Sequence, residues 1–128
     1  MALDYGSART GVAVSDATGT LARPLCTVER AAGEPGLRRI AALVAEEGAE
    51  RIVVGLPLTL KGEQGAQADE TARFVEALRA AVEVPVESFD ERFTTALAAS
   101  SPSSQAPEDA RAAAHLLESY LIWTSRTE

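Results

Sequence analysis

The 128-residue chain is long enough for one domain with a real core, since 46% of its residues are hydrophobic. Its formal net charge of −7 excludes a protein that holds nucleic acid through bulk positive charge, which needs clustered Lys and Arg. Its one cysteine, Cys26, excludes an internal disulfide, and the lack of a recognisable leader or of an apolar run of ~18 residues predicts a soluble cytoplasmic protein without a membrane partner.

Three extended runs come first among the predicted elements. The first ends near Asp4, the second spans Thr10 to Ser15 with alternating valines, and the third spans Leu21 to Glu29. The stretches between them, Tyr5-Gly6-Ser7 and Asp16 to Gly19, are typical of turns. The three runs are therefore predicted to form an antiparallel meander.

Helices and strands alternate after the meander. Apolar residues recur at helical spacing from Pro35 to Gly48 and again from Ala68 to Leu78. The nearly all-apolar run from Arg51 to Gly55 predicts a central strand that is covered on both faces. Val84 to Phe89 predicts another strand, with Pro85 near its start or at a sheet edge, where its missing N–H does no harm.

The C-terminal part contains a predicted mobile loop and a last helix. Ser100 to Pro107 is rich in small polar residues and proline, so we expect it to be mobile. The last helix is expected from about Pro107 to Trp123. The order β-β-β-α-β-α-β-α predicts an α/β fold, a single domain over residues 1–128 whose mixed sheet carries helices on both faces.

Three carboxylate positions lie at the ends of predicted elements, and each has an ordinary structural explanation. Asp4 precedes a turn, where its side chain can simply accept backbone hydrogen bonds. Asp90-Glu91-Arg92 fits a solvated turn with a local ion pair. Asp109 lies in the first turn of a helix, where the helix dipole stabilises an acid. Residue type alone leaves structural and functional interpretations open.

The spacing around Asp109 favours a functional role. This residue continues the apolar stripe of the last helix, which consists of Ala112, Ala113, Leu116, Leu117, Tyr120 and Leu121. The small alanines let the helix approach the sheet and bring Asp109 near the strand that ends at Asp4. Converging acids repel each other, and a bound Mg²⁺ or Mn²⁺ keeps such oxygen ligands ionised and can hydrolyse a phosphodiester by a two-metal mechanism. The lone His115 lies on the polar helix face and is expected at the surface.

Five motifs spread over nearly the whole chain are specific when they are taken together. They are ALDYGSARTGVAVSD at Ala2 to Asp16, ARPL at Ala22 to Leu25, IVVGLPLTLKGEQG at Ile52 to Gly65, FDERFTT at Phe89 to Thr95, and D-x-x-A-A followed by L-L-x-x-Y-L from Asp109 to Leu121. These motifs resemble the YqgF or RuvX family, described as pre-16S rRNA nucleases and Holliday-junction-resolvase-like enzymes of the RNase H superfamily. The resemblance implies an RNase H-like fold.

The resemblance also implies roles for individual residues. It implies that Asp4, Glu91 and Asp109 are the metal-binding, catalytic acids, with Asp90 as a fourth ligand or a partner of one. The positions that match the family's contacts to nucleic acid are Arg9, Arg92, Lys61, Thr94 and Thr95. One departure is that Ala96 to Glu108 has no basic residue, whereas the family has a longer Lys- and Arg-rich segment there. We therefore expect weaker binding of duplexes or junctions. A second subunit in a homodimer is one source of the missing positive surface.

Three function classes stay open at this point. The first is a metal-dependent nuclease that uses Mg²⁺ or Mn²⁺ on structured nucleic acid, either at the 5′ end of pre-16S rRNA or at Holliday-junction-like DNA. The second is a non-catalytic RNA-binding module of ribosome assembly, which the missing basic segment favours. The third is an ATP-binding domain of the actin and sugar-kinase kind, whose first phosphate loop also begins D-x-G after a strand. Such enzymes close two domains around the nucleotide, and one domain is predicted here.

Overall fold

The computed structural model describes residues 1–16, 18–19, 21–57, 65–91 and 107–127. Within them the elements follow in the order β1 (Ala2–Asp4), β2 (Arg9–Ser15), β3 (Ala22–Glu29), α1 (Glu34–Glu47), β4 (Ile52–Leu56), α2 (Ala66–Ala81), β5 (Val86–Asp90) and α3 (Glu108–Thr127). This confirms the predicted order of strands and helices, and each element lies within a few residues of its expected bounds.

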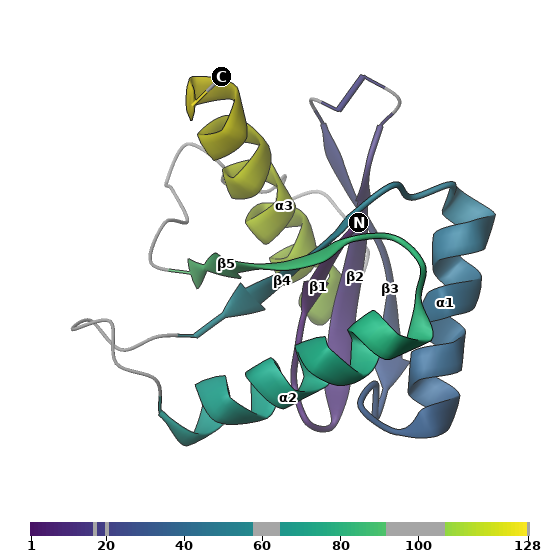
Figure 1. Ribbon diagram of the computed structural model, residues 1–128. Coiled ribbons are helices and arrows are strands. Elements are labelled where there is room, and N and C mark those ends of the chain that lie inside the picture. The colour runs from purple at the N-terminus through teal and green to yellow at the C-terminus, as the bar shows by residue number, and fades with distance from the viewer. Residues whose placement is uncertain (17, 20, 58–64, 92–106, 128) are drawn as a thin grey trace.

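The strands form one 5-stranded mixed sheet in the order β3-β2-β1-β4-β5 (Figure 1). β2 pairs antiparallel with both β1 and β3, which confirms the predicted meander. β4 runs parallel to both β1 and β5, so it lies inside the sheet, as its apolar sequence predicted. The carboxyl ends of β1, β4 and β5 therefore lie at the same end of the sheet.

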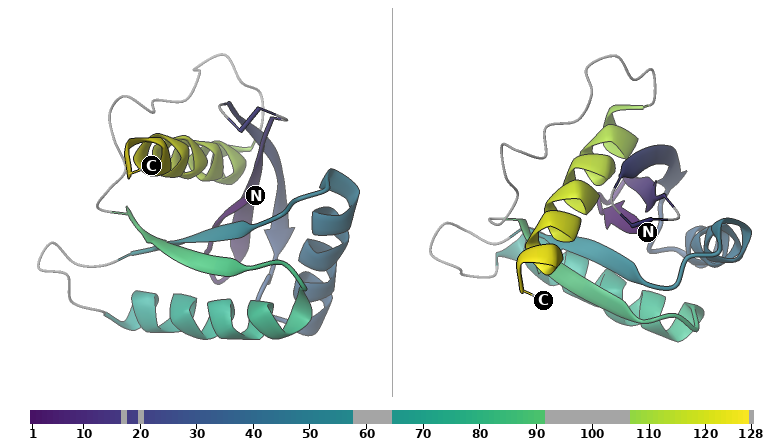
Figure 2. Two further views of the ribbon diagram at one scale, coloured as in Figure 1. Left: turned by 45° about the horizontal axis from the view of Figure 1, so that its top comes forward. Right: turned by 90° about the horizontal axis from the view of Figure 1, so that it is seen from above.

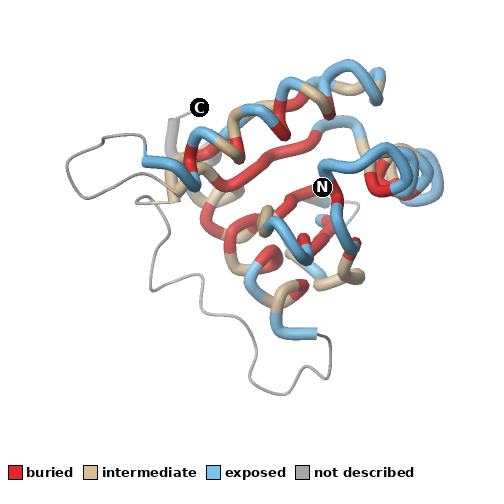
Figure 3. Tube along the Cα trace, turned by 90° about the horizontal axis from the view of Figure 1, so that it is seen from below, coloured by how far each residue is buried: buried red, intermediate tan, exposed pale blue. Residues whose placement is uncertain are grey.

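Helices cover both faces of the sheet, as predicted (Figures 1 and 2). α1 and α2 lie on one face and α3 lies on the other. Side chains alternate along a strand, so Leu3 and Val12 pack with Phe74 of α2, while Ala2 and Ala13 pack beneath α3. Burial follows the strands and the inward sides of the helices (Figure 3). Small residues on the α3 face let this helix lie close to the sheet.

Local signals in the sequence set several element ends. α1 has Pro35 in its first turn and ends at Gly48, whose φ of 65° lies in the left-handed region that favours glycine. β5 begins at Val86, two residues later than expected, because Pro85 has no N–H for a ladder hydrogen bond. The Pro85 carbonyl still accepts a hydrogen bond from the Ile52 N–H at 2.9 Å. Pro85 thus directly precedes the edge strand β5, which agrees with its predicted place near the start of a strand or at a sheet edge.

The predicted mobile loop, Ser100 to Pro107, lies outside the described residues except for Pro107 itself. None of the helices that the structure describes combines the length and the hydropathy needed to cross a membrane.

Candidate functional site

The three acids singled out in the sequence come from three elements that converge at the carboxyl end of the parallel strands. Asp4 is the last residue of β1, Glu91 directly follows β5, and Asp109 is the second residue of α3. Asp4 shares a hydrogen bond with Glu91, and the negative charge of Asp109 raises the pKa of Asp4. The structure therefore brings Asp4 and Glu91 into contact and places Asp109 near enough for its charge to act on Asp4.

Gly11 lets α3 reach this position. It lies opposite Asp4 in the β1–β2 pairing. A Cβ on Gly11 would stand 1.8 Å from the carbonyl oxygen of Asp109 and 2.9 Å from the backbone nitrogen of Ala110. The first turn of α3 thus lies directly on the β2 backbone, beside Asp4, and only a residue without a side chain permits that contact.

Gly55 makes the corresponding space on β4. A Cβ there would stand 2.7 Å from Glu91 Oε1 and 3.1 Å from Leu116 Cδ2. Because β4 separates β1 from β5 in the sheet, the Glu91 side chain reaches Asp4 only by lying across β4. Gly55 leaves the room for it to do so.

Asp4 and Glu91 form a half-buried carboxyl pair. Burial and the negative charge of Asp109 raise the pKa of Asp4, and its hydrogen bond with Glu91 acts in the opposite direction. Burial, the charge of Asp4, the hydrogen bond to Asp4 and the charge of Asp90 raise the pKa of Glu91. The hydrogen bond between the two acids thus raises the pKa of Glu91 and lowers that of Asp4. Two acids held this close in a half-buried site also favour a cation between them.

The Asp109 carboxylate is held by an arginine. Arg9 Nε lies 3.2 Å from Asp109 Oδ2, and the two side chains are 68% and 37% exposed. Arg9 opens β2, two residues before Gly11, so it stands beside the first turn of α3. Arg9 and Asp109 were both predicted for the site, one for phosphate and one for metal, and the structure pairs them with each other.

The donor chemistry fits a hard divalent cation. Asp4 and Glu91 offer carboxylate oxygens within hydrogen-bond reach of each other, and a cation would allow both to be ionised. Among the described residues, however, no three His, Cys, Asp or Glu side chains are grouped as a complete metal site. Asp109 would join the pair only by leaving Arg9. Asp90, the predicted fourth ligand, acts on Glu91 through its charge.

The remaining predicted site residues lie outside the described chain, and His115, which was expected at the surface, lies on α3. Lys61, Arg92, Thr94 and Thr95 are outside the described residues, so their roles stay predictions. His115 is partly exposed, and its charge acts on Glu118 of the same helix.

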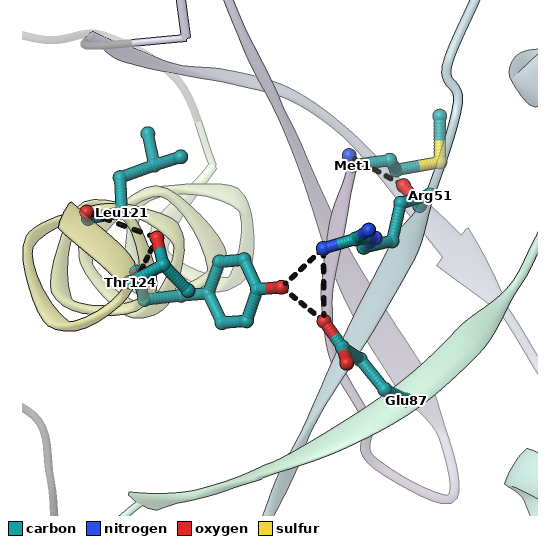
Figure 4. Close-up of polar contacts among 6 residues, drawn as sticks. Met1, Arg51, Glu87, Leu121 and Thr124 are labelled. Carbon is teal, nitrogen blue, oxygen red and sulfur yellow. Dashed lines mark hydrogen bonds and ion pairs between the residues drawn. The ribbon is translucent and has the colours of Figure 1, made fainter. Parts of the chain in front are cut away.

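A polar cluster that the sequence analysis did not find ties the far half of α3 to the sheet (Figure 4). The Tyr120 hydroxyl donates to Glu87 Oε1, and Arg51 Nη1 donates to the Tyr120 hydroxyl at 3.1 Å and lies 3.7 Å from Glu87 Oε1. This cluster joins α3, β5 and the residue before β4, so it fixes the helix whose first turn carries Asp109. No local pattern predicts it, because Tyr120 is separated from its partners by 33 and 69 residues.

The roles of Gly11 and Gly55 were also missed. A glycine inside a strand often marks the close approach of another segment. Both glycines carry that signal, since each lies between apolar or β-branched residues in a strand. The sequence does not say which segment approaches.

Known proteins resemble this chain over most of its length. The sequence model of the RuvX family, described as Holliday junction resolvase, matches residues 1–122. Relatives carrying the name "Putative pre-16S rRNA nuclease" include one from Chloroflexus aggregans, 50% identical over 77% of this chain and 69% of its own length. Others come from Desulforudis audaxviator, 47% identical over 75% of this chain and 68% of its own, and from Rhodococcus erythropolis, 49% identical over 77% and 59%. The match thus spans between 59% and 69% of these relatives.

A solved structure shows the same fold. It is described as T. thermophilus RuvC in complex with Holliday junction substrate, and it aligns with a TM-score of 0.68 at 14% identity, over 97% of this chain and 92% of that chain. The likeness confirms the predicted RNase H-like α/β fold. The family match over residues 1–122 and the relatives near 50% identity lead to one assignment. The chain belongs to the RuvX family.

Proposed function

We propose that this chain is a divalent-metal-dependent nuclease that hydrolyses phosphodiester bonds in structured nucleic acid. The observation that carries the proposal is the convergence of Asp4, Glu91 and Asp109, with Gly11 and Gly55 making the space for it. Family membership supports the same chemistry. The proposal therefore covers both the class of reaction and the residues that carry it.

The names of the similar proteins suggest two substrates. The relatives are named for pre-16S rRNA, and the RuvC structure holds a Holliday junction. We propose the 5′ end of the rRNA precursor as the first substrate, because the relatives named for it are up to 50% identical to this chain, whereas RuvC is 14% identical.

In this proposal the acids would hold the metal and Arg9 would contact the substrate. A bound Mg²⁺ or Mn²⁺ would activate the attacking water and stabilise the leaving oxygen. Asp4 and Glu91 would hold it through carboxylate oxygens, in place of the hydrogen bond between them. Arg9 would contact a phosphate of the substrate through its planar guanidinium, which suits phosphate geometry. Its departure from Asp109 would free that carboxylate for the metal site.

A cleavage panel tests the proposal. A pre-rRNA 5′ end, a single-stranded RNA and a four-way DNA junction are incubated with Mn²⁺, with Mg²⁺ or with EDTA. We expect cleavage of the precursor that needs the metal and is lost in an Asp4→Asn, Asp109→Asn double variant. Equal turnover by the double variant, or by the wild type in EDTA, would refute the assignment of these acids.

A second candidate function is a non-catalytic RNA-binding module of ribosome assembly. The Arg9–Asp109 ion pair favours it, because Asp109 is then engaged in the fold and the acid pair lacks its third member. This alternative predicts metal-independent binding of the rRNA precursor without turnover, measured in the same panel by gel shift.

We also propose a homodimer, in which basic residues of a second subunit contact the substrate in place of the basic segment that Ala96 to Glu108 lacks. Sedimentation with and without a nucleic acid substrate checks this, since a dimer doubles the mass of the protein component.

A further inference from the structure

A groove of about 520 Å³ lies between the edge strand β5 and the C-terminal half of α3. Its walls include the aromatic residues Phe89, Tyr120 and Trp123. Phe89 comes from β5, and the other two come from α3. The groove is separate from the contacts among Asp4, Glu91 and Asp109 described above.

The aromatic residues are arranged edge to face. The ring of Phe89 lies 5.6 Å from that of Tyr120, at an interplanar angle of 85°, and 6.0 Å from that of Trp123, at 68°. Phe89 is buried, whereas Trp123 is 44% exposed and is, with Leu21, one of the two exposed large hydrophobic residues in the described part of the chain. The buried Phe89 ring thus packs against the Trp123 indole, which solvent and a ligand can reach.

The charges along the groove select the kind of ligand. Glu87 lies in the wall but is already engaged by Arg51 and the Tyr120 hydroxyl (Figure 4). Arg51 also lines the groove, and its guanidinium lies against Tyr120 and Glu87, while Asp90 adds a second carboxylate. Asp90 would repel a phosphate, whereas a nucleobase is neutral, has a flat face for stacking and carries N–H groups that a carboxylate accepts. With the charge of Arg51 offset by Glu87, the lining suits a base better than a phosphate.

The groove and the candidate active site meet at adjacent residues of the chain. Asp90 is the last residue of β5 and lines the groove, and Glu91 follows it directly and contacts Asp4. A nucleic acid whose phosphate lies at the acid pair would therefore have a neighbouring nucleotide at the mouth of the groove.

We propose that this groove is a subsite in which Trp123 stacks an unpaired nucleobase next to the scissile phosphate. The inference rests on the proposed nuclease function and deepens it, because a base can enter the groove only where it is not held in a continuous duplex. The substrate class is therefore nucleic acid with a single-stranded segment at the cleavage point, as at the end of an RNA precursor.

The test uses Trp123 as its own probe, since it is the single tryptophan of the chain. The full chain, in EDTA to prevent cleavage, is titrated with a single-stranded RNA of about eight nucleotides and with a blunt duplex of the same sequence. We expect the single strand to quench the tryptophan fluorescence and the duplex to leave it unchanged.

Variants measure the contribution of the ring. With a labelled strand and anisotropy as the readout, Trp123→Ala should weaken single-strand binding about 10-fold to 100-fold, the range for loss of one stacked base. Trp123→Phe keeps an aromatic face and should recover most of the affinity. Leu21→Ala, at the other exposed hydrophobic residue, should bind as the wild type does. Circular dichroism checks that each variant is folded.

Several results would overturn the subsite. The first is that a saturating single strand leaves the tryptophan fluorescence of the wild type unquenched. The second is that folded Trp123→Ala binds the single strand with wild-type affinity. The third is that Trp123→Ala weakens the binding of single strand and duplex equally. A Trp123→Ala variant that changes only the sedimentation of the protein would assign the groove to a second copy of the chain.

The failure of the subsite is distinguishable from that of the nuclease. Metal-dependent cleavage that is insensitive to Trp123 keeps the nuclease and rejects the subsite. Quenching by single strands in a protein that never cleaves keeps the subsite and rejects the nuclease.

Discussion

The carboxylates near the two halves of α3 have opposite electrostatic surroundings. Near its C-terminal half, Glu87 lies against the cationic Arg51 and the hydroxyl of Tyr120, so its charge has local partners. Near its first turn, Asp4 and Glu91 lie against each other and beside the negative charges of Asp109 and Asp90, and both have a raised pKa. A carboxylate with local partners stabilises the fold, whereas an acid pair held together without a cation is costly to the fold. This cost distinguishes the candidate catalytic acids from the structural one.

The largest expected effect is on cleavage by Asp4→Asn. Loss of a metal ligand removes several kcal/mol of transition-state stabilisation, so we expect turnover to fall by about 10³ or more. The same change removes a charge that burial disfavours, so the free energy of unfolding without metal should rise at neutral pH. Urea denaturation and single-turnover cleavage measure the two effects. A variant that is both active and less stable would break the comparison.

The next effect is on stability in Gly11→Ala. The added methyl group would stand 1.8 Å from the Asp109 carbonyl oxygen, so α3 must move off the sheet. We expect a loss of about 3 kcal/mol, at the upper end for overpacking, together with loss of cleavage. Gly65→Ala is the matched control, because nothing lies within 4 Å of its added Cβ and its backbone is extended. Similar denaturation curves for the two variants would contradict this account of Gly11.

The pH dependence separates the acid pair from the other carboxylates. A raised pKa means that the folded chain holds its proton more tightly than the unfolded chain, so the pair favours folding most below the unfolded values of 3.8 and 4.5. That advantage is lost as pH rises through the folded pKa values. The stability gained by Asp4→Asn over the wild type should therefore grow from pH 4 to pH 7 in EDTA. A gain that shrinks over this range has the wrong sign.

A smaller effect is expected for Arg9→Gln. Its ion pair with Asp109 is largely exposed, so stability should change by at most about 0.5 kcal/mol. Binding of nucleic acid should weaken, and the slope of log affinity against log salt should fall by about one phosphate contact. Arg38→Gln, in an exposed pair with Glu34 on α1, is the control that should keep the wild-type slope.

The smallest effect is expected for Glu87→Gln. The glutamine can still accept the hydrogen bond from Tyr120, and the lost pair with Arg51 is about half exposed, so we expect a destabilisation of about 0.5 kcal/mol. Because Glu87 only lines the groove and does not contact Asp4, the cleavage rate at saturating substrate should be unchanged. Thermal unfolding and the cleavage assay together check that this carboxylate is structural.

Much of the fold and part of the site follow from the sequence. Periodicity and turn residues predict the elements because these signals are local, and the place of Asp109 on the apolar stripe of α3 predicts its approach to Asp4. The contacts with Gly11 and Gly55 were not predictable, because they depend on strand order and register, which join residues far apart in the chain. The Arg9–Asp109 pair was missed for the same reason.

The central claim is that the paired acids, and not the Glu87 carboxylate, bind the metal. Calorimetric titration with MnCl₂, without nucleic acid, tests it on the wild type, Asp4→Asn and Glu87→Gln. We predict that Asp4→Asn weakens Mn²⁺ binding at least about tenfold, the effect of removing one tight ligand interaction, and that Glu87→Gln binds as the wild type does. Unchanged binding by Asp4→Asn, or an equal loss in Glu87→Gln, would contradict the account.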